Sequence, residues 1–210
     1  MTDDARAVSP WEAALGVSVD ELHPRLRTYF AGISPGRVGR GEGVFEVVGT
    51  PRRWLWPALA VLGLDGILFP VWQRAVPFTV VNRGDAGVVH ARRTFAFRRG
   101  SRTMVDATSF EGGRLVDRLG RHGLLAASFR AEVVGGRLEL TSTAVRVAGV
   151  RMPRPLSPVV RLIERYDDDL DRQRVSVTLD LPGLGRLYEY GGTFDYRVVD
   201  DESAATEETG

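Results

Sequence analysis

Residues 124–148 read LLAASFRAEVVGGRLELTSTAVRVA, the most informative stretch of the 210-residue chain. Two runs that alternate between apolar and polar residues, Leu124–Val134 and Arg137–Ala148, flank the dipeptide Gly135-Gly136. A period of two is typical of a strand that buries one face, and a Gly-Gly link favours the tight turns of hairpins. The stretch therefore predicts a long antiparallel β-hairpin.

Similar strand-like runs lie on both sides of this hairpin, separated by short breaks rich in glycine and polar residues: Gly43–Gly49, Ala75–Asn82, Gly87–Phe97, Ser101–Phe110, Arg114–Arg118, Val175–Leu181 and Arg186–Val199. Short links between successive strands imply antiparallel neighbours in up-and-down order. We expect seven or eight long strands, and a sheet of that size curls or closes because open edges invite aggregation. The prediction is a mainly β (α+β) fold, an antiparallel meander curled into a barrel-like, lipocalin-like sheet.

One segment, Leu156–Asp168, is compatible with two structures. The spacing of Val159, Leu162 and Tyr166 fits a helix. The same residues could instead pair with Val175–Leu181 across a turn rich in aspartate. We favour the strand and leave the helix as the alternative.

Two helices are expected before the β region. Ser18 and Glu21 have the spacing of a capping box, which predicts a helix from there to about Gly32. Thr50-Pro51 predicts the start of a tryptophan-rich helix that ends near Leu64. The predicted organisation is a disordered N-terminus over 1–17, a single barrel-like domain over 18–199 and a disordered acidic tail over 200–210.

Composition excludes several classes of site. The chain has no cysteine, and its three histidines are far apart, so thiolate chemistry and a histidine-built zinc site are not expected. No βαβ alternation is present, which argues against a dinucleotide-binding fold, and we expect neither a cofactor nor catalytic residues. All 28 basic residues are arginine. The tail carries five of the acidic residues, so the rest of the chain has 28 arginines and 22 acidic residues. The arginines form no basic run interleaved with aromatics, so nucleic-acid binding is not expected.

The most apolar segment is WLWPALAVLGLDGILFPVW, residues 54–72. It contains Asp65 and two prolines, which oppose a transmembrane helix. We predict a buried helix followed by a turn, with an interfacial or ligand-gating helix as the alternative. The first nineteen residues lack the apolar core of a signal peptide, so no membrane span and a cytoplasmic location are expected.

The candidate site residues fall into two groups, each on one face of a predicted strand. Arg93 occupies an otherwise apolar face with Phe95 and Phe97. A buried guanidinium requires a partner, so Arg93 either holds the acidic head of a ligand or pairs with an internal acid such as Glu164 or Glu189. Even spacing on the last strand places four aromatic residues on one face, where they would pack the core or line a cavity: Tyr188, Tyr190, Phe194 and Tyr196.

Two aspartates, Asp106 and Asp117, lie on neighbouring predicted strands. Paired carboxyl groups can carry acid–base catalysis when they lie within reach of one another. Carboxylates on a β surface are usually solvated, and we expect that state here.

An ordered series of short patterns resembles the bacterial domain-of-unknown-function family 4166 over about residues 22–196. The series is Gly41-x-Gly43-x-Phe45, the tryptophan-rich helix, Val76-Pro77-Phe78, Arg93-Thr-Phe95-x-Phe97, Gly136-x-Leu138, Leu156-x-Pro158, Pro182-x-x-Gly185 and Tyr190-Gly191-Gly192-x-Phe194. The family tends to show an aromatic residue before its R-x-F, where this chain has His90 and Ala91. The resemblance implies no catalytic residues, because the family has no established activity. Members attached to saccharopine-dehydrogenase-like NAD(P)-binding domains imply an accessory role beside such a reductase.

We therefore hypothesise non-catalytic binding of a hydrophobic or amphipathic small molecule in the barrel. Arg93 would anchor an acidic head, and the six aromatic residues above would supply the walls. The alternatives are substrate presentation to a separate NAD(P)-dependent reductase of the saccharopine-dehydrogenase type and a structural barrel that binds another protein.

Overall fold

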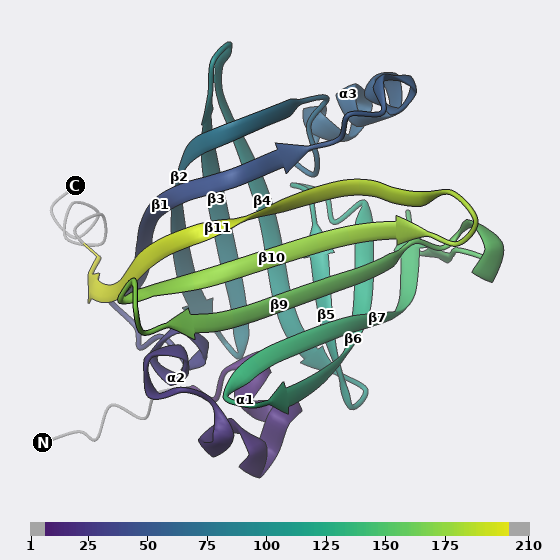
Figure 1. Ribbon diagram of the computed structural model, residues 1–210. Coiled ribbons are helices and arrows are strands. Elements are labelled where there is room, and N and C mark those ends of the chain that lie inside the picture. Colours follow the sequence, from purple (N-terminus) through teal and green to yellow (C-terminus); the bar gives the residue numbers. More distant parts are fainter. Residues whose placement is uncertain (1–6, 202–210) are drawn as a thin grey trace, which may run out of the picture.

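The computed structural model describes residues 7–201 and shows a closed antiparallel β-barrel with helices at both ends (Figure 1). The predictions made for residues 1–6 and 202–210 lie outside this part of the chain. The elements in chain order are α1 (Pro10–Leu15), η1 (Gly16–Glu21), α2 (Pro24–Phe30), β1 (Arg37–Gly49), η2 (Arg53–Leu55), α3 (Trp56–Leu64), β2 (Trp72–Asp85), β3 (Val88–Phe97), β4 (Gly100–Glu111), β5 (Arg114–Leu119), β6 (Leu125–Val134), β7 (Arg137–Val147), β8 (Val150–Arg151), η3 (Arg154–Leu156), β9 (Val159–Asp167), β10 (Arg172–Leu181) and β11 (Gly185–Asp200).

The sheet follows the predicted up-and-down order. Each barrel strand pairs antiparallel with the next one along the chain, and β1 closes the ring by pairing with β11. The short strand β8 pairs with β7 alone and stands outside this cycle. All ten predicted runs form barrel strands, so the ring is larger than the seven or eight long strands expected.

The ambiguous segment is a strand. β9 pairs with β10 across the turn after Asp167, as the favoured interpretation required. It also pairs with β7, with Leu140 opposite Leu162. The helical alternative is therefore wrong. Without β9, strands β7 and β10 would each have an edge with unpaired backbone hydrogen-bonding groups.

The N-terminal helices differ in position from the prediction. The capping box lies at Ser9 and Glu12, and helix α1 begins at Pro10 inside the stretch expected to be disordered. Ser18 lies in the 3₁₀ turn η1, and the second helix begins only at Pro24 with the His23 side chain as its cap. Four large side chains of this segment are nevertheless buried in the core: Leu22, Leu26, Tyr29 and Phe30.

The two ends of the barrel have different covers. We call the end carrying α1, η1 and α2 the α1 end, and the opposite end the α3 end (Figure 1). At the α1 end Trp11 packs against Phe30, with ring centroids 5.4 Å apart.

At the α3 end, the tryptophan-rich helix ends at Leu64 as expected, but it begins at Trp56 rather than after Thr50, and the prediction that it is buried is wrong because it extends beyond the barrel wall. The segment after α3 turns into the barrel instead and buries Ile67 and Phe69. No helix within residues 7–201 has the length and apolar character that crossing a bilayer would need.

Candidate functional site

A charged cluster in the barrel interior begins with Arg93 on β3. Its Nη1 donates a hydrogen bond to Oδ1 of Asp106 on β4. Asp106 lies opposite Ala91 in the ladder, so the guanidinium reaches it diagonally. The Asp106 side chain is 4% exposed and that of Arg93 22%. A buried charge is tolerated when it is paired, and each of these groups supplies the other's partner.

Two further carboxyl groups face the same space. Asp117 on β5 accepts a hydrogen bond from the Thr108 hydroxyl at 3.3 Å. Glu164 on β9 accepts one from the side-chain amide of Gln173. A cavity of about 50 Å³ is lined by all the ionisable groups of this cluster: Arg93, Asp106, Asp117 and Glu164.

Burial controls the protonation of these carboxyl groups. Loss of solvent, reinforced by the charge of Asp106, raises the pKa of Asp117 to about 8. Burial raises the pKa of Glu164 to about 7, although the amide of Gln173 opposes the shift. Burial also raises the pKa of Asp106, against the opposing effect of Arg93. The interior therefore holds protons on carboxyl groups near neutral pH, and Asp117 can donate as well as accept a hydrogen bond.

The interior contains three neighbouring cavities, of about 20, 50 and 110 Å³, which all touch Leu162. The largest is an apolar lobe towards the α3 end, with walls that include Met104, Leu125 and Val177. Asp117 lines both this lobe and the charged cavity. The hollow thus runs from an apolar lobe to a polar cluster.

Exposure of inward-facing side chains agrees with a hollow interior. Alternation along β9 and β11 directs Val160, Leu162 and Tyr190 into the barrel, yet each remains partly exposed. On the opposite wall Phe95 and Met104 are fully buried. Partial exposure of inward residues arises where packing leaves space beside them.

The structure brings three of the predicted site residues together. Arg93, Tyr190 and Phe194 line the cavity of about 20 Å³, with Tyr29 of α2 and Glu164. The partner of Arg93 is Asp106, which the sequence analysis did not propose for it. Glu164 shares the cavity, whereas Glu189 accepts a hydrogen bond from Arg186.

The other predicted residues lie apart from this cavity. Phe95 and Tyr188 are fully buried and pack the core. Phe97 lines a separate pocket at the α3 end. Tyr196 lies near the α1 end, where its hydroxyl accepts a hydrogen bond from Asn82 at 3.4 Å.

The expectation that Asp106 and Asp117 are solvated is wrong. Both point into the barrel, and a signal for this was present in the sequence. Asp106 alternates with Met104, and Asp117 lies between Leu115 and Leu119, so each acid occupies the apolar face of its strand. The same parity argument that singled out Arg93 applies to them. Trp11, which also lines the charged cavity, had no such signal because it lies on a helix outside the sheet.

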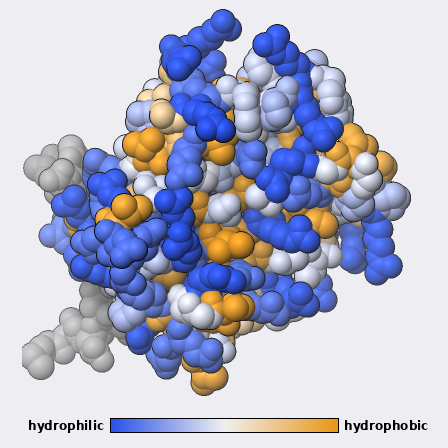
Figure 2. Space-filling model, viewed as in Figure 1, coloured by the Kyte–Doolittle hydropathy of each residue, from blue (hydrophilic) through white to orange (hydrophobic). Residues whose placement is uncertain are grey.

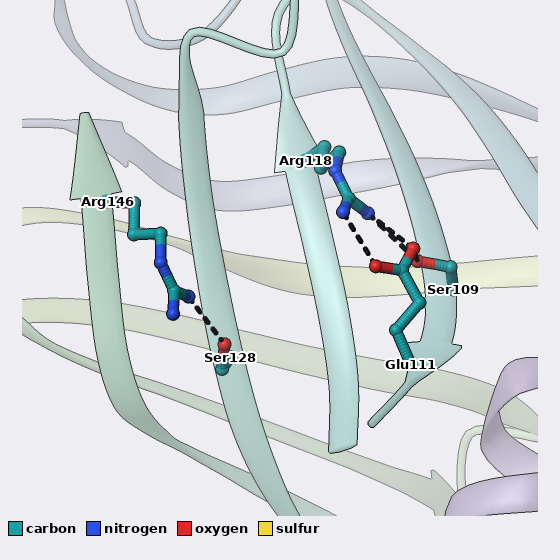
Figure 3. A network of polar contacts seen from close by, with 5 residues as sticks. All are labelled: Ser109, Glu111, Arg118, Ser128 and Arg146. Carbon is teal, nitrogen blue, oxygen red and sulfur yellow. Dashed lines mark hydrogen bonds and ion pairs between the residues drawn. The ribbon is translucent and has the colours of Figure 1, made fainter. Parts of the chain in front are cut away.

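The outer face of the same strands carries a different kind of polar network (Figure 3). Arg118 on β5 forms two hydrogen bonds of 2.8 Å to Glu111, and it also contacts Ser109 on β4. Further along this face Arg146 on β7 donates to Ser128 on β6 at 3.4 Å. Hydrogen bonds from Arg118 and Ser109 lower the pKa of Glu111 to about 2. Polar groups on this face are paired and ionised, in contrast to those inside.

Within residues 7–201, no three histidine, aspartate or glutamate side chains are grouped as ligands for a metal ion. The interior can bind polar atoms through hydrogen bonds and apolar atoms through its lobe.

A protein-family model described as "Domain of unknown function (DUF4166)" matches residues 22–194. The chain belongs to this family. No curated protein and no solved structure matches the chain. The matched DUF4166 residues include every strand that contributes to the interior cluster.

Glycines of the DUF4166 pattern lie where the barrel closes. A Cβ on Gly43 of β1 would stand 2.0 Å from the carbonyl oxygen of Thr193, and one on Gly192 of β11 would stand 2.2 Å from that of Val44. Real Cβ atoms do not approach backbone oxygens so closely, so only glycine fits these positions. The paired glycine motifs therefore allow β1 and β11 to approach and seal the ring.

Proposed function

We propose that this DUF4166 barrel binds a short amphipathic molecule in its interior without transforming it. The observation that carries the proposal is the change in polarity along the hollow, from the apolar lobe to the charged cluster. Sites for small ligands typically combine apolar walls with a few convergent polar groups. The apolar lobe has a volume of about 110 Å³, which favours a short apolar chain over a long one.

The proposed polar head is a hydrogen-bond donor. Holding an acidic head was one of the two roles expected for Arg93, but Asp106 already pairs with that guanidinium. A further anion would meet the carboxylate of Asp106 and a guanidinium that already has its counter-ion, so no cation of this cluster is left to neutralise it. A hydroxyl or amine head would instead donate to Asp117 or Glu164, which each have one side-chain hydrogen-bond partner within residues 7–201.

Other parts of the functional hypothesis stay as proposals without a structural observation of their own. They are a bacterial cytoplasmic location, substrate presentation to a separate saccharopine-dehydrogenase-like reductase, and a structural role in binding another protein. A bound small molecule would argue against the purely structural role.

Native mass spectrometry of the protein purified from its own host tests the proposal. Leu162 lines all three cavities, and its neighbour Ile163 faces outward with 37% of its surface exposed. We expect wild type and I163W to carry a discrete mass that is lost on denaturation, and L162W to carry none because the indole fills the hollow. Thermal unfolding checks that L162W is folded, and A127L fills the lobe as a second variant.

The proposal would be wrong if wild type carries no such mass and gains none after incubation with octanol or octylamine. Equal loss of ligand from L162W and I163W would also contradict it, because the outward substitution leaves the hollow unchanged.

A further inference from the structure

The α3 end combines exposed apolar side chains with unpaired positive charge. Helix α3 is apolar on every face, a pattern that usually marks a buried helix. It projects from the barrel instead, at the upper right in Figure 1. Exposed fractions there reach 78% for Leu64, 64% for Val61 and 60% for Trp54. Nothing within residues 7–201 covers these side chains.

Neighbouring loops extend this apolar surface. Val150 and Leu156, beside β8 and η3, are 71% and 58% exposed, and Leu184 in the β10–β11 turn is 44% exposed. Arg52 donates a hydrogen bond of 2.7 Å to the carbonyl of Leu184, which ties this turn to the segment before α3. In Figure 2 hydrophobic side chains gather at the right edge, where the β10–β11 turn lies in Figure 1.

Charge at the two ends of the barrel has opposite sign. The α3 end contains nine arginines and one acid, Asp65, in residues 49–72, 97–102, 119–125, 147–159 and 181–186. Within the described chain Arg186 alone among these nine forms an ion pair with a carboxylate. The α1 end contains eleven acids and five arginines in residues 9–30, 85–88, 111–114, 134–137, 167–172 and 200–201. The protein would therefore approach an anionic partner with its own α3 end first.

A pocket of about 500 Å³ opens at the α3 end between the β3–β4 hairpin and the segments flanking α3. Its walls combine aromatic rings with guanidinium groups: Trp56, Trp72, Phe97, Arg53, Arg98 and Arg102. The guanidinium of Arg53 lies 5.9 Å from the ring centroid of Trp56. Arginine recognises phosphate by paired hydrogen bonds, and tryptophan favours the boundary between lipid and water.

We propose that the α3 end docks on an anionic phospholipid membrane. Helix α3 lies in the interface, its nine residues being too few to cross a bilayer. The arginines around it contact lipid phosphates, and the pocket accepts a headgroup. A membrane fits better than a protein partner because it covers an apolar helix on all exposed faces and supplies negative charge around it. The docking does not depend on the interior site.

Vesicle flotation of the full chain tests this proposal. We expect wild type to float with vesicles of phosphatidylglycerol and phosphatidylcholine, and not with phosphatidylcholine alone. R98Q/R99Q should weaken binding roughly thirtyfold, since each arginine near an anionic surface contributes about fivefold. L64D should abolish flotation, because a carboxylate would replace the most exposed apolar group of α3.

Matched controls lie at the α1 end. Val17 is 89% exposed there, and V17D should float like wild type. R114Q removes an exposed arginine at the start of β5, at the α1 end, and should also leave binding unchanged. Tryptophan emission should shift to shorter wavelength on the anionic vesicles, and W54F should reduce that shift because Trp54 is the most exposed tryptophan at the α3 end.

Three outcomes would overturn the docking. Wild type could fail to float with anionic vesicles, or V17D could weaken flotation as much as L64D. Light scattering could instead show a dimer that L64D separates, with flotation unaffected; the apolar surface would then bind a second copy.

Discussion

The carboxyl group of Asp117 lies inside the barrel and binds a proton there, which makes the free energy of unfolding depend on pH. Its pKa is raised to about 8 by burial, so the folded protein holds a proton that the unfolded chain releases near its ordinary pKa of 3.8. A raised carboxyl pKa gives stability that is fully present below the unfolded value and is lost as pH rises through the folded value. Glu164, raised to about 7, acts in the same direction.

We predict that the free energy of unfolding of wild type falls between about pH 5 and 8, by up to about 1.4 kcal/mol per pH unit for each group. D117N should reduce this slope, since an amide does not titrate. Urea unfolding at a series of pH values measures it. A wild-type stability that rises steadily over this range would contradict the assigned protonation.

The Arg93–Asp106 pair gives a second prediction at this scale. R93M leaves the carboxylate of Asp106 buried without its cation, which should cost about 3–5 kcal/mol. R93M/D106L removes both charges and should be more stable than R93M. Chemical denaturation of the two variants and wild type provides the comparison. A double variant no more stable than R93M would show that the loss is one of packing.

The alternation of side chains between the two faces of a strand placed Arg93 on the inner face, as the structure shows. The same reasoning applied to Asp106 and Asp117 would have placed all three side chains inside the barrel. The partner of Arg93 was not predictable, because it depends on the register between β3 and β4. That register brings Ala91 opposite Asp106, and no local pattern specifies it.

At the scale of single elements, the β1–β11 seam is the most constrained contact. G192A should destabilise the protein by several kcal/mol, because the added Cβ would stand 2.2 Å from the carbonyl oxygen of Val44 and neither backbone can move without opening the ring. V44A is the matched control, since Val44 is 43% exposed and its truncation should cost well under about 1 kcal/mol. Thermal unfolding of both variants measures the difference. Equal stability of G192A and wild type would show that the seam tolerates a wider separation.

The strands were more predictable than the helices for a physical reason. Apolar and polar residues alternate along the whole β region, and glycine-rich breaks recur between the runs. The position predicted for one strand is therefore constrained by the strands predicted before and after it. The capping-box spacing occurs twice, at Ser9/Glu12 and Ser18/Glu21. Tertiary packing selects the first, because it places Trp11 against Phe30.

At the scale of the whole molecule, the apolar part of the hollow and the apolar part of the surface lie towards the same end of the barrel. The apolar lobe lies towards the α3 end and is lined by Ile67 and Leu68, which follow α3 after Asp65 and Gly66. Docking of that end would bring the lobe next to the lipid. A molecule entering from the membrane would then have its apolar part in the lobe and its head at Asp117 and Glu164.

A crystal structure of wild type purified from its own host examines the interior itself. We predict continuous density beside Leu162 that extends from the apolar lobe to the carboxyl groups of Asp117 and Glu164, and that belongs to no protein atom. An interior closed by Leu162 and Tyr190, with no density beyond protein and isolated water, would contradict ligand binding in the barrel.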